Sequence, residues 1–286
     1  MEKKFCAFRY LITTSEQLSL FDNNIEKEEL VKEVFRILEK AKKTNWSNSS
    51  AKFIFIGIEQ YKDELFFLKF AKESDNVLYI EEEKDIAKKI VREAKYIYII
   101  VNTKHQIILV EDNKSVFQNI QKVGTLVSKY INERIANYPY SLNVYPLVKQ
   151  QSFWNQVENA DSIFKLILEL NAPNMAFFAN RKAQELLKTI QEETNNEELD
   201  IILKNSKGNL DIKKNSIGEW INYIREVGGK YIMKYKSDGD KAMRTLKSTD
   251  EIYITKVNLN EDFLDVVTKQ EILEKTNKMN DLENRI

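Results

Sequence analysis

The sequence predicts an α+β protein built from a mixed or largely antiparallel sheet and packed amphipathic helices. Runs rich in β-branched and aromatic residues recur along the chain, several of them in pairs separated by short polar turns. Between these runs, apolar residues follow the three- and four-residue spacing of helices. With 286 residues, of which 43% are hydrophobic, the chain can bury a sizeable core. We expect two α/β subdomains, residues 1–140 and 141–286, that meet near residues 138–151.

Local patterns predict the elements of the N-terminal subdomain. Strands are expected at residues 4–13, 53–58, 65–70, 96–101 and 107–110, of which the last four form two hairpins. Helices are expected at residues 25–43, 81–93 and 115–135. The segment Thr44–Ser50 is rich in Asn and Ser, which predicts a loop.

The C-terminal subdomain has the same alternation of extended and helical patterns. Strands are expected at residues 142–148, 199–203, 231–235 and 252–257. Helices are expected at residues 176–193, 216–227 and 261–286, the last with a frayed end. The pair Gly228-Gly229 is predicted to stop the second of these helices, and the polar segment Ser237–Arg244 predicts a mobile loop.

Composition limits the classes of function. Lys plus Arg and Asp plus Glu number 44 each, so a binding face for a charged partner must be local. A single cysteine, Cys6, excludes an intramolecular disulfide framework and a multi-cysteine zinc site, and it favours a reducing compartment. The N-terminal residues contain only a short apolar stretch interrupted by Arg9, which fits neither a signal peptide nor a membrane span. We therefore expect a cytoplasmic protein with no membrane partner.

Residues that often carry catalysis are few. The only histidine, His105, lies in a predicted turn, and no nearby motif completes a triad, so we interpret it as a surface residue. Cys6 lies in a predicted buried strand and is interpreted as a small apolar filler. Gly228-Gly229 before Lys230 could contact a phosphate, but a helix stop is the simpler interpretation. We expect no catalytic residue, no metal site and no cofactor, which fits a binding protein better than an enzyme.

Carboxylates near lysines leave one enzymatic alternative open. A metal-dependent nuclease needs carboxylates to hold a divalent ion and a nearby lysine to polarise the attacking water. Two groups contain such side chains: Glu111, Asp112 and Lys114 after one strand, and Glu59, Glu64 and Lys69 around the first hairpin. Neither group has a tight acid-x-lysine spacing, so solvated turns and strand edges are the favoured interpretation. A divergent nuclease using Glu59, Glu64 or Glu111 stays the alternative.

The most useful local signal is the basic segment Lys230–Lys247. Two acidic residues are outnumbered there by six basic ones: Lys230, Lys234, Lys236, Lys241, Arg244 and Lys247. In a strand, alternation would separate the lysines from Tyr231, Met233 and Tyr235 on the other face. Lysines neutralise phosphates without reading bases, so these residues predict nonspecific, salt-sensitive binding to a DNA or RNA backbone. A solvated basic strand and loop is the alternative interpretation.

The order of elements between residues 107 and 170 carries a resemblance to a known family. A strand ending in Val110-Glu111 is followed by a long helix, the run Leu142–Leu147 and the run Ile163–Glu169. Over this part, about a quarter of the chain, the sequence resembles the RexA phage-exclusion proteins of lambdoid prophages. More loosely, it resembles bacterial defence-island proteins of similar length and the DNA-binding subunit of the Kiwa defence system. The resemblance implies a cytoplasmic bacterial homodimer that binds DNA without strong sequence preference and acts in phage exclusion or abortive infection.

The leading hypothesis is therefore a nucleic-acid-binding component of an antiviral defence system. The divergent nuclease is the first alternative. The second is a scaffold or toxin-neutralising protein whose exposed helical faces bind a neighbour-encoded defence protein. The amphipathic C-terminal segment also permits a homodimer interface.

Overall fold

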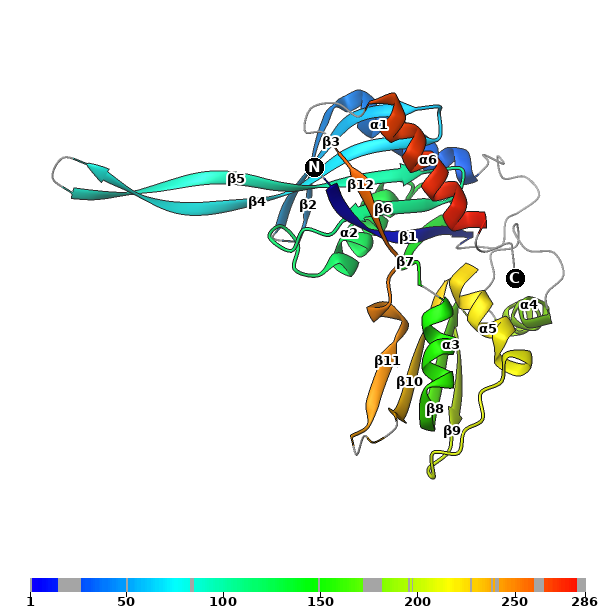
Figure 1. Cartoon of the computed structure of the whole chain (residues 1–286). Helices are drawn as coiled ribbons and strands as arrows, with labels where there is room; N and C mark the ends of the chain where they lie inside the picture. Colours follow the sequence, from blue (N-terminus) through cyan, green and yellow to red (C-terminus); the bar gives the residue numbers. More distant parts are fainter. Residues whose placement is uncertain are drawn as a thin grey trace. The chain divides into compact units, whose positions relative to one another are not determined.

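The computed structural model describes residues 2–14, 27–49, 51–82, 85–148, 150–171, 182–194, 196, 198–226, 228–237, 239, 242–259 and 265–281. Its strands (Figure 1) are β1 (Glu2–Thr14), β2 (Lys43–Asn48), β3 (Ala51–Tyr61), β4 (Leu65–Glu82), β5 (Asp85–Asn102), β6 (Ile107–Glu111), β7 (Tyr140–Pro146), β8 (Ala160–Asn171), β9 (Glu198–Lys204), β10 (Gly229–Ser237), β11 (Arg244–Lys247) and β12 (Ile254–Asn258). Its helices are α1 (Lys27–Ala41), α2 (Ile120–Arg134), α3 (Gln150–Glu158), α4 (Lys182–Thr194), α5 (Lys214–Glu226) and α6 (Val266–Asp281). A curled antiparallel sheet and a second sheet, with more strand (50%) than helix (32%), confirm the α+β class.

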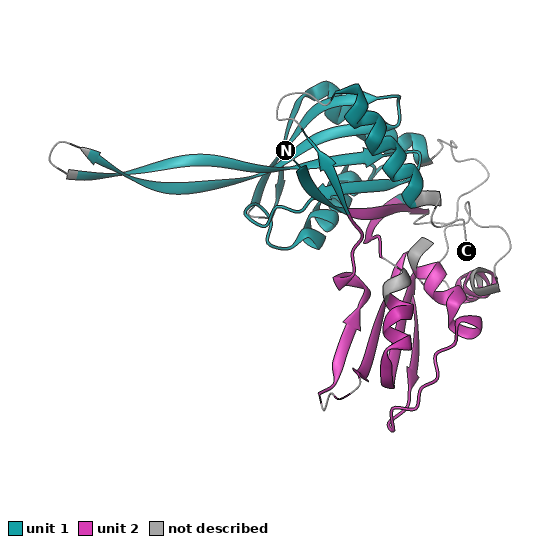
Figure 2. Cartoon of the chain, viewed as in Figure 1, with its two compact units in different colours: residues 1–6, 18–140, 255–286 teal, residues 7–17, 141–254 magenta. Residues whose placement is uncertain are grey.

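The chain forms two compact units (Figure 2). Unit 1 comprises residues 1–6, 18–140 and 255–286, and unit 2 comprises residues 7–17 and 141–254. Strand β1 therefore contributes residues to both units, and helix α6 belongs to unit 1. The units assign residues 7–17 and 255–286 differently from the expected subdomains 1–140 and 141–286, and that expected division stays a prediction.

The larger sheet is built mainly from successive antiparallel hairpins. Its strand order is β12-β1-β6-β5-β4-β3-β2, with β7 paired to β1. Both predicted hairpins are confirmed, because β3 pairs antiparallel with β4 and β5 pairs antiparallel with β6. Aromatic rings join the sheet to two helices: Phe66 lies 5.8 Å from Phe35 of α1, and Phe55 lies 4.4 Å from Tyr130 of α2, between ring centroids. All four side chains are buried in the core of unit 1.

The loop predicted at Thr44–Ser50 is wrong, because residues 43–48 form strand β2 at the edge of this sheet. The polar composition suggested a loop, but Trp46 lies in the middle of the segment and is buried. Its ring packs edge-on against Tyr130 at 5.6 Å, and its Nε1 donates a hydrogen bond to Glu133 Oε2 at 2.7 Å. Burial of one large ring with a satisfied N–H is enough to hold a short polar strand on the sheet. Ser50 lies outside the described residues.

The helix predicted at residues 81–93 is also wrong, because this segment belongs to a long hairpin. Strands β4 and β5 pair without interruption from Leu65 and Asn102 to Glu82 and Asp85. Pairing with β3 ends at Lys72, and beyond it the two strands continue as a ribbon that projects from the sheet (Figure 1). We call residues 73–82 and 85–94 the ribbon arm. Pairing between its strands satisfies backbone groups that the predicted helix would have paired internally.

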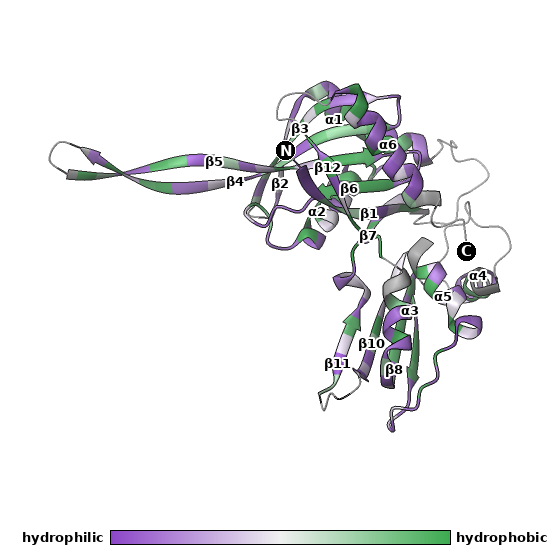
Figure 3. Ribbon diagram, in the orientation of Figure 1, coloured by the Kyte–Doolittle hydropathy of each residue, from purple (hydrophilic) through white to green (hydrophobic). Residues whose placement is uncertain are grey.

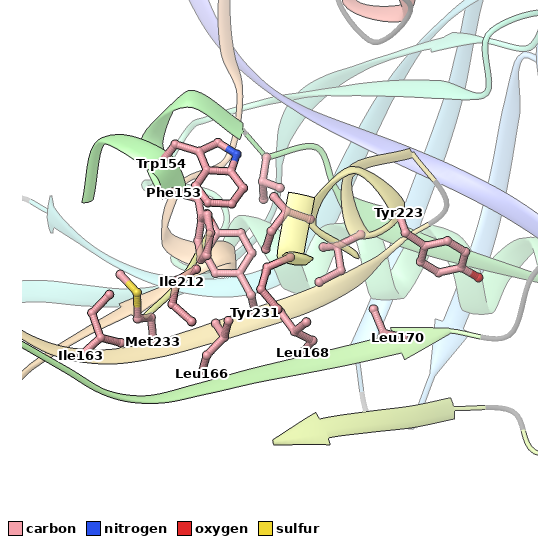
Figure 4. Close-up of a cluster of buried hydrophobic side chains, with 14 of the residues drawn as sticks. Phe153, Trp154, Ile163, Leu166, Leu168, Leu170, Ile212, Tyr223, Tyr231 and Met233 are labelled. Carbon is pink, nitrogen blue, oxygen red and sulfur yellow. The ribbon is translucent and has the colours of Figure 1, made fainter. Parts of the chain in front are cut away.

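The smaller sheet lies in unit 2 and has the order β11-β10-β8-β9, with antiparallel neighbours throughout. Leu166, Leu168 and Leu170 alternate along β8 and point to one face, where they are fully buried. There they join a cluster that includes Phe153 of α3 and Ile221 of α5 (Figure 4). These helices therefore cover one face of the sheet, and the buried cluster is the core of unit 2.

Most elements expected in the C-terminal half are confirmed. Strands β7, β9, β10 and β12 and helix α5 lie at the predicted places. Helix α5 ends at Glu226 and β10 begins at Gly229, so Gly228-Gly229 does stop the helix; Gly228 has a φ of +110° and donates its N–H to Ile224 O at 3.1 Å. The loop predicted at Ser237–Arg244 is wrong at both ends: Ser237 ends β10, where it pairs with Ala160 of β8, and Arg244 begins β11, where it pairs with Tyr235 of β10. Asp238, Asp240 and Lys241 lie outside the described residues.

Helices α4 and α6 occupy parts of two longer predicted helices. Residues 172–181, 260–264 and 282–286, which belong to or flank those predictions, lie outside the described residues. The apolar side chains Ile272 and Leu273 of α6 are buried, and Thr276 Oγ1 accepts a hydrogen bond from Asn102 of β5 at 2.8 Å. This side of α6 is therefore covered by the chain itself. In the described ranges, no helix is long and apolar enough to cross a membrane.

Candidate nucleic-acid interface

Strand β10 carries the first half of the predicted basic segment and lies between β8 and β11. The predicted alternation is confirmed: Tyr231, Met233 and Tyr235 are buried, whereas Lys230 and Lys234 are exposed. The buried residues belong to the unit 2 core, which fixes the direction of every side chain on the strand. The lysines therefore lie on the face of the sheet opposite the helices.

The outward side chains described on that face of the sheet are exposed or half-buried on every strand. On β8 the residues that alternate with the buried leucines are half-buried, and on β9 Asp200, Ile202 and Lys204 are exposed. Among the described residues, no helix packs on this side. A ligand can therefore reach side chains of all four strands at once.

Cross-strand pairing aligns three lysines on this face. Lys234 of β10 pairs with Lys165 of β8, and Lys165 pairs with Lys204 of β9. We call these three residues the lysine row. Directly opposed residues hold their side chains on the same face with Cβ atoms roughly 5 Å apart. Three ammonium groups thus extend side by side from three neighbouring strands.

Within the part of the chain that the structure describes, no acidic partner neutralises the lysine row. Within the described ranges, none of Lys165, Lys204 and Lys234 forms an ion pair. The situation differs two pairs further along the strands, where Lys230 lies opposite Glu169 and its Nζ is 3.3 Å from Glu169 Oε2. Asp200 lies on the other side of Glu169. One end of the outer face is therefore charge-balanced, and the lysine row leaves a local positive excess.

Two further lysines extend this positive excess. Lys247 of β11 lies opposite Ile232, in a pair adjacent to the lysine row on the same face. Lys236 follows Lys234 on β10, and its Nζ lies 5.7 Å from the centroid of the Phe164 ring. We call the lysine row together with Lys236 and Lys247 the lysine face. It brings together five cations from four strands, of which β8, β9 and β10 belong to separate parts of the sequence.

The structure sorts the six basic residues predicted from the sequence into different places. Lys234, Lys236 and Lys247 lie on the lysine face. Lys230 lies on the same side of the sheet but pairs with Glu169. Arg244 lies opposite the buried Tyr235, so by strand alternation it projects to the side opposite Lys247. Lys241 lies outside the described residues.

Sequence reasoning missed Lys165 and Lys204. A signal was present for Lys165, since the run from Leu166 to Leu170 alternates leucines with other residues and so marks Lys165 as solvent-facing. The strand pairing that brings the three lysines together has no local signature. Only the register between β10, β8 and β9 reveals the row.

The arrangement is electrostatically costly for the free protein. Like charges directly opposite each other on one sheet face destabilise the pairing by roughly 0.2–1 kcal/mol per pair. A polyanion removes this repulsion and gains from counterion release when its phosphates contact the lysines. The lysine face is thus suited to bind several closely spaced phosphates.

The carboxylates considered for a nuclease are engaged in local contacts. Glu111 is buried, where it accepts hydrogen bonds from Lys3 Nζ at 2.7 Å and from the backbone N–H of Tyr98 at 2.9 Å. Glu59 pairs with Lys269 at 2.6 Å, and Glu64 pairs with Lys104 at 3.4 Å. Across the described residues, no group of three or more Asp, Glu, His or Cys side chains could hold a metal ion.

His105 lies in the turn between β5 and β6, as predicted. Its backbone N–H donates to Asn102 Oδ1 at 3.1 Å, so Asn102 closes the turn around it. Gln106, which follows it, has a positive φ of 55°, a conformation typical of a tight turn. The hydrogen bond to Asn102 therefore holds the backbone of His105 within the hairpin turn.

Cys6 should react slowly in the folded chain. It is buried in β1, and burial raises the pKa of its thiol from 9.0 to about 11. Only the thiolate is nucleophilic, so at pH 8 the native protein holds roughly a hundredfold less reactive species than the unfolded chain. We expect iodoacetamide to alkylate native protein at least about a hundredfold more slowly than urea-unfolded protein, and faster as pH rises toward 11. Similar native and unfolded rates would contradict the apolar-filler interpretation.

Two comparisons with known proteins give no match to this chain. No protein-family model matches it, and no curated protein is significantly similar to it. A function must therefore be inferred from the lysine face itself.

Proposed function

We propose that the protein binds the phosphate backbone of DNA or RNA on the lysine face without reading base sequence. The observation that carries this proposal is the lysine row, in which Lys234, Lys165 and Lys204 lie directly opposite one another with no ion-pair partner among the described residues. A solvated strand surface has no need to align like charges, because the alignment lowers stability. Binding of a polyanion gives that cost a functional reason.

The spacing of the lysine row suits a nucleic-acid strand. Three neighbouring strands of a sheet span roughly 10 Å, since adjacent strands lie about 4.8 Å apart. One strand of B-DNA advances about 3.4 Å per phosphate along the helix axis, so about three phosphates fit over the row. Lysine ammonium groups act as point charges and do not read base edges, which favours binding to any sequence.

This activity is compatible with the role that the family resemblance implies. A cytoplasmic component of a phage-exclusion or abortive-infection system must recognise nucleic acid whose sequence varies between phages. Contacts to phosphate groups alone meet that requirement, because every nucleic acid presents them. We therefore propose nonspecific backbone binding as the contribution of this chain to antiviral defence.

The test is the salt dependence of binding. Fluorescence anisotropy with a labelled duplex should give a dissociation constant for the full chain that rises steeply with salt. Replacement of the lysine row by Lys165→Gln, Lys204→Gln and Lys234→Gln should weaken binding on the order of a hundredfold at low salt. The slope of log K against log salt should fall by about 2.7, which is 0.9 for each lost phosphate contact.

A matched control removes three lysines from the helical side of unit 2. Lys188 lies on α4, Lys214 begins α5, and Lys213 precedes it. Lys213 pairs with Asp211 at 2.8 Å and Lys214 with Glu158 at 3.6 Å. Glutamine at these three positions makes the same change in net charge and should leave the affinity and the slope nearly unchanged. Equal losses in the two triple variants, or a flat salt dependence of the unmodified chain, would overturn the proposal.

A further inference from the structure

The ribbon arm of unit 1 is a second surface that the chain leaves uncovered. Its ten cross-strand pairs run from Glu73 and Ala94 to Glu82 and Asp85, a length of roughly 33 Å. Within the described residues, no third strand and no helix packs on it. Every side chain described on the arm is exposed or half-buried. An isolated two-stranded ribbon is at best marginally stable in water, so a partner is expected to hold the arm.

One face of the arm carries most of its exposed apolar surface. Strand alternation places Glu73 with Ala94 at the base of this face and, beyond them, four successive pairs: Asp75 with Arg92, Val77 with Ile90, Tyr79 with Lys88, and Glu81 with Ile86. We call the eight residues of these four pairs the pairing face. The side chains of Tyr79, Ile90 and Ile86 are 70%, 67% and 64% exposed. Figure 3 shows hydrophobic stretches on both strands of the arm. Apolar side chains clustered in this way are typical of an interaction surface.

The charge of the arm argues against nucleic acid as its partner. Seven acidic residues lie between positions 73 and 94, namely Glu73, Asp75, Glu81, Glu82, Glu83, Asp85 and Glu93. Only four basic residues lie in the same range, namely Lys84, Lys88, Lys89 and Arg92. A surface with an acidic excess repels phosphates, whereas alternating charges among apolar residues suit a protein surface of complementary pattern.

We propose that the pairing face packs against the same face of a second copy of this chain, about a two-fold axis that runs along the arm. Such an axis places each β4 residue of one copy over a β5 residue of the other copy. The two residues are those that pair with each other across the strands within a single chain. Asp75 then meets Arg92 of the second copy, and Val77 meets Ile90. The charged pair and the apolar pair each occur twice, as an isologous interface requires.

The remaining two pairs fit the same axis. Tyr79 meets Lys88 of the second copy, which sets an ammonium group over an aromatic ring. Glu81 meets Ile86, so no like charges are opposed anywhere on the pairing face. A two-fold axis across the arm at the Val77–Ile90 pair would instead set Arg92 over Lys88, which is repulsive. The charge pattern therefore favours the axis along the arm, with a second copy whose arm runs in parallel as the partner.

Charge reversal on the pairing face tests this interface with the full chain. The ion pair of Arg92 Nε with Asp75 Oδ1, at 3.8 Å, is exposed to solvent on both sides, so its loss within one chain costs little stability. In sedimentation velocity, the unmodified chain should be a dimer at micromolar concentration. Asp75→Arg alone sets arginine over arginine in a dimer, and Arg92→Asp alone sets aspartate over aspartate. Each variant should raise the dimer dissociation constant about tenfold or more.

An equimolar mixture of the two variants provides the decisive result. In the mixed dimer both contacts join an arginine to an aspartate, so the dimer should re-form although each chain carries the same change as before. Loss of folding cannot produce this recovery. As a matched control, Lys89→Glu reverses a charge on the opposite face of the arm, beside Leu78, and should leave the dimer intact. A monomeric unmodified chain, single variants that stay dimeric, or a mixture that stays monomeric would each overturn the proposal.

Discussion

Truncation of Phe153 to alanine is expected to lower the free energy of unfolding of the protein by about 3–5 kcal/mol. Phe153 of α3 is fully buried, and its ring lies 4.9 Å from that of Trp154 and 4.8 Å from that of Tyr231, both in edge-to-face geometry (Figure 4). Its removal takes away the apolar contact between α3 and β10 and leaves a cavity that the surrounding rings fill only in part. Urea unfolding followed by tryptophan fluorescence measures the change.

The prediction for Phe153 also concerns the lysine face, because Phe153 packs against a strand that carries part of that face. Tyr231, which it contacts, belongs to the strand that carries Lys234 and Lys236 on its other side. The matched control is Leu186→Ala, because Leu186 is half exposed on α4 and its truncation should change stability by less than about 0.5 kcal/mol. Equal effects of the two truncations would mean that unit 2 lacks the packed core on which the orientation of β10 depends.

Local sequence patterns were sufficient to predict which side chains of a single strand are buried and which face solvent. Alternation predicted that Tyr231, Met233 and Tyr235 are buried and that Lys230 and Lys234 face solvent, and the structure confirms both. The pattern succeeds because the side-chain period of a strand is two residues, whatever its neighbours are. Three of the five lysines of the lysine face, Lys234, Lys236 and Lys247, could therefore be predicted from one segment of the chain.

The other two lysines depend on pairing between distant segments. Lys165 and Lys204 join Lys234 only through the register of β8 with β10 and β9, which no local sequence pattern encodes. The same limit explains the misassigned helix at residues 81–93. Its charged residues are compatible with a helix, and the competing strand is determined by pairing with residues 74–80, for which the sequence predicted no element. Non-local pairing decided both outcomes.

Replacement of Gly57 by alanine should be as damaging to unit 1 as the loss of Phe153 is to unit 2. Gly57 of β3 lies directly beneath α1, and its N–H donates to Lys42 O at 2.9 Å. A Cβ atom here would lie 2.5 Å from both the Cα of Glu39 and the carbonyl oxygen of Leu38. These are backbone atoms of the helix, so no side-chain rotation relieves the overlap. We expect the free energy of unfolding to fall by about 3 kcal/mol, measured by urea unfolding followed by circular dichroism.

A second glycine separates this steric effect from a general effect of alanine. Gly218 lies within α5, where the nearest atom to an added Cβ would be Cζ2 of Trp154 at 3.9 Å, an ordinary contact distance. Gly218→Ala should therefore raise stability by about 0.5–1 kcal/mol, because alanine has the higher helix propensity. The two substitutions add the same methyl group and should shift the unfolding midpoint in opposite directions. A Gly57→Ala protein as stable as the unmodified chain would show that α1 does not press on β3 at this position, and the packing of that helix would have to be reassigned.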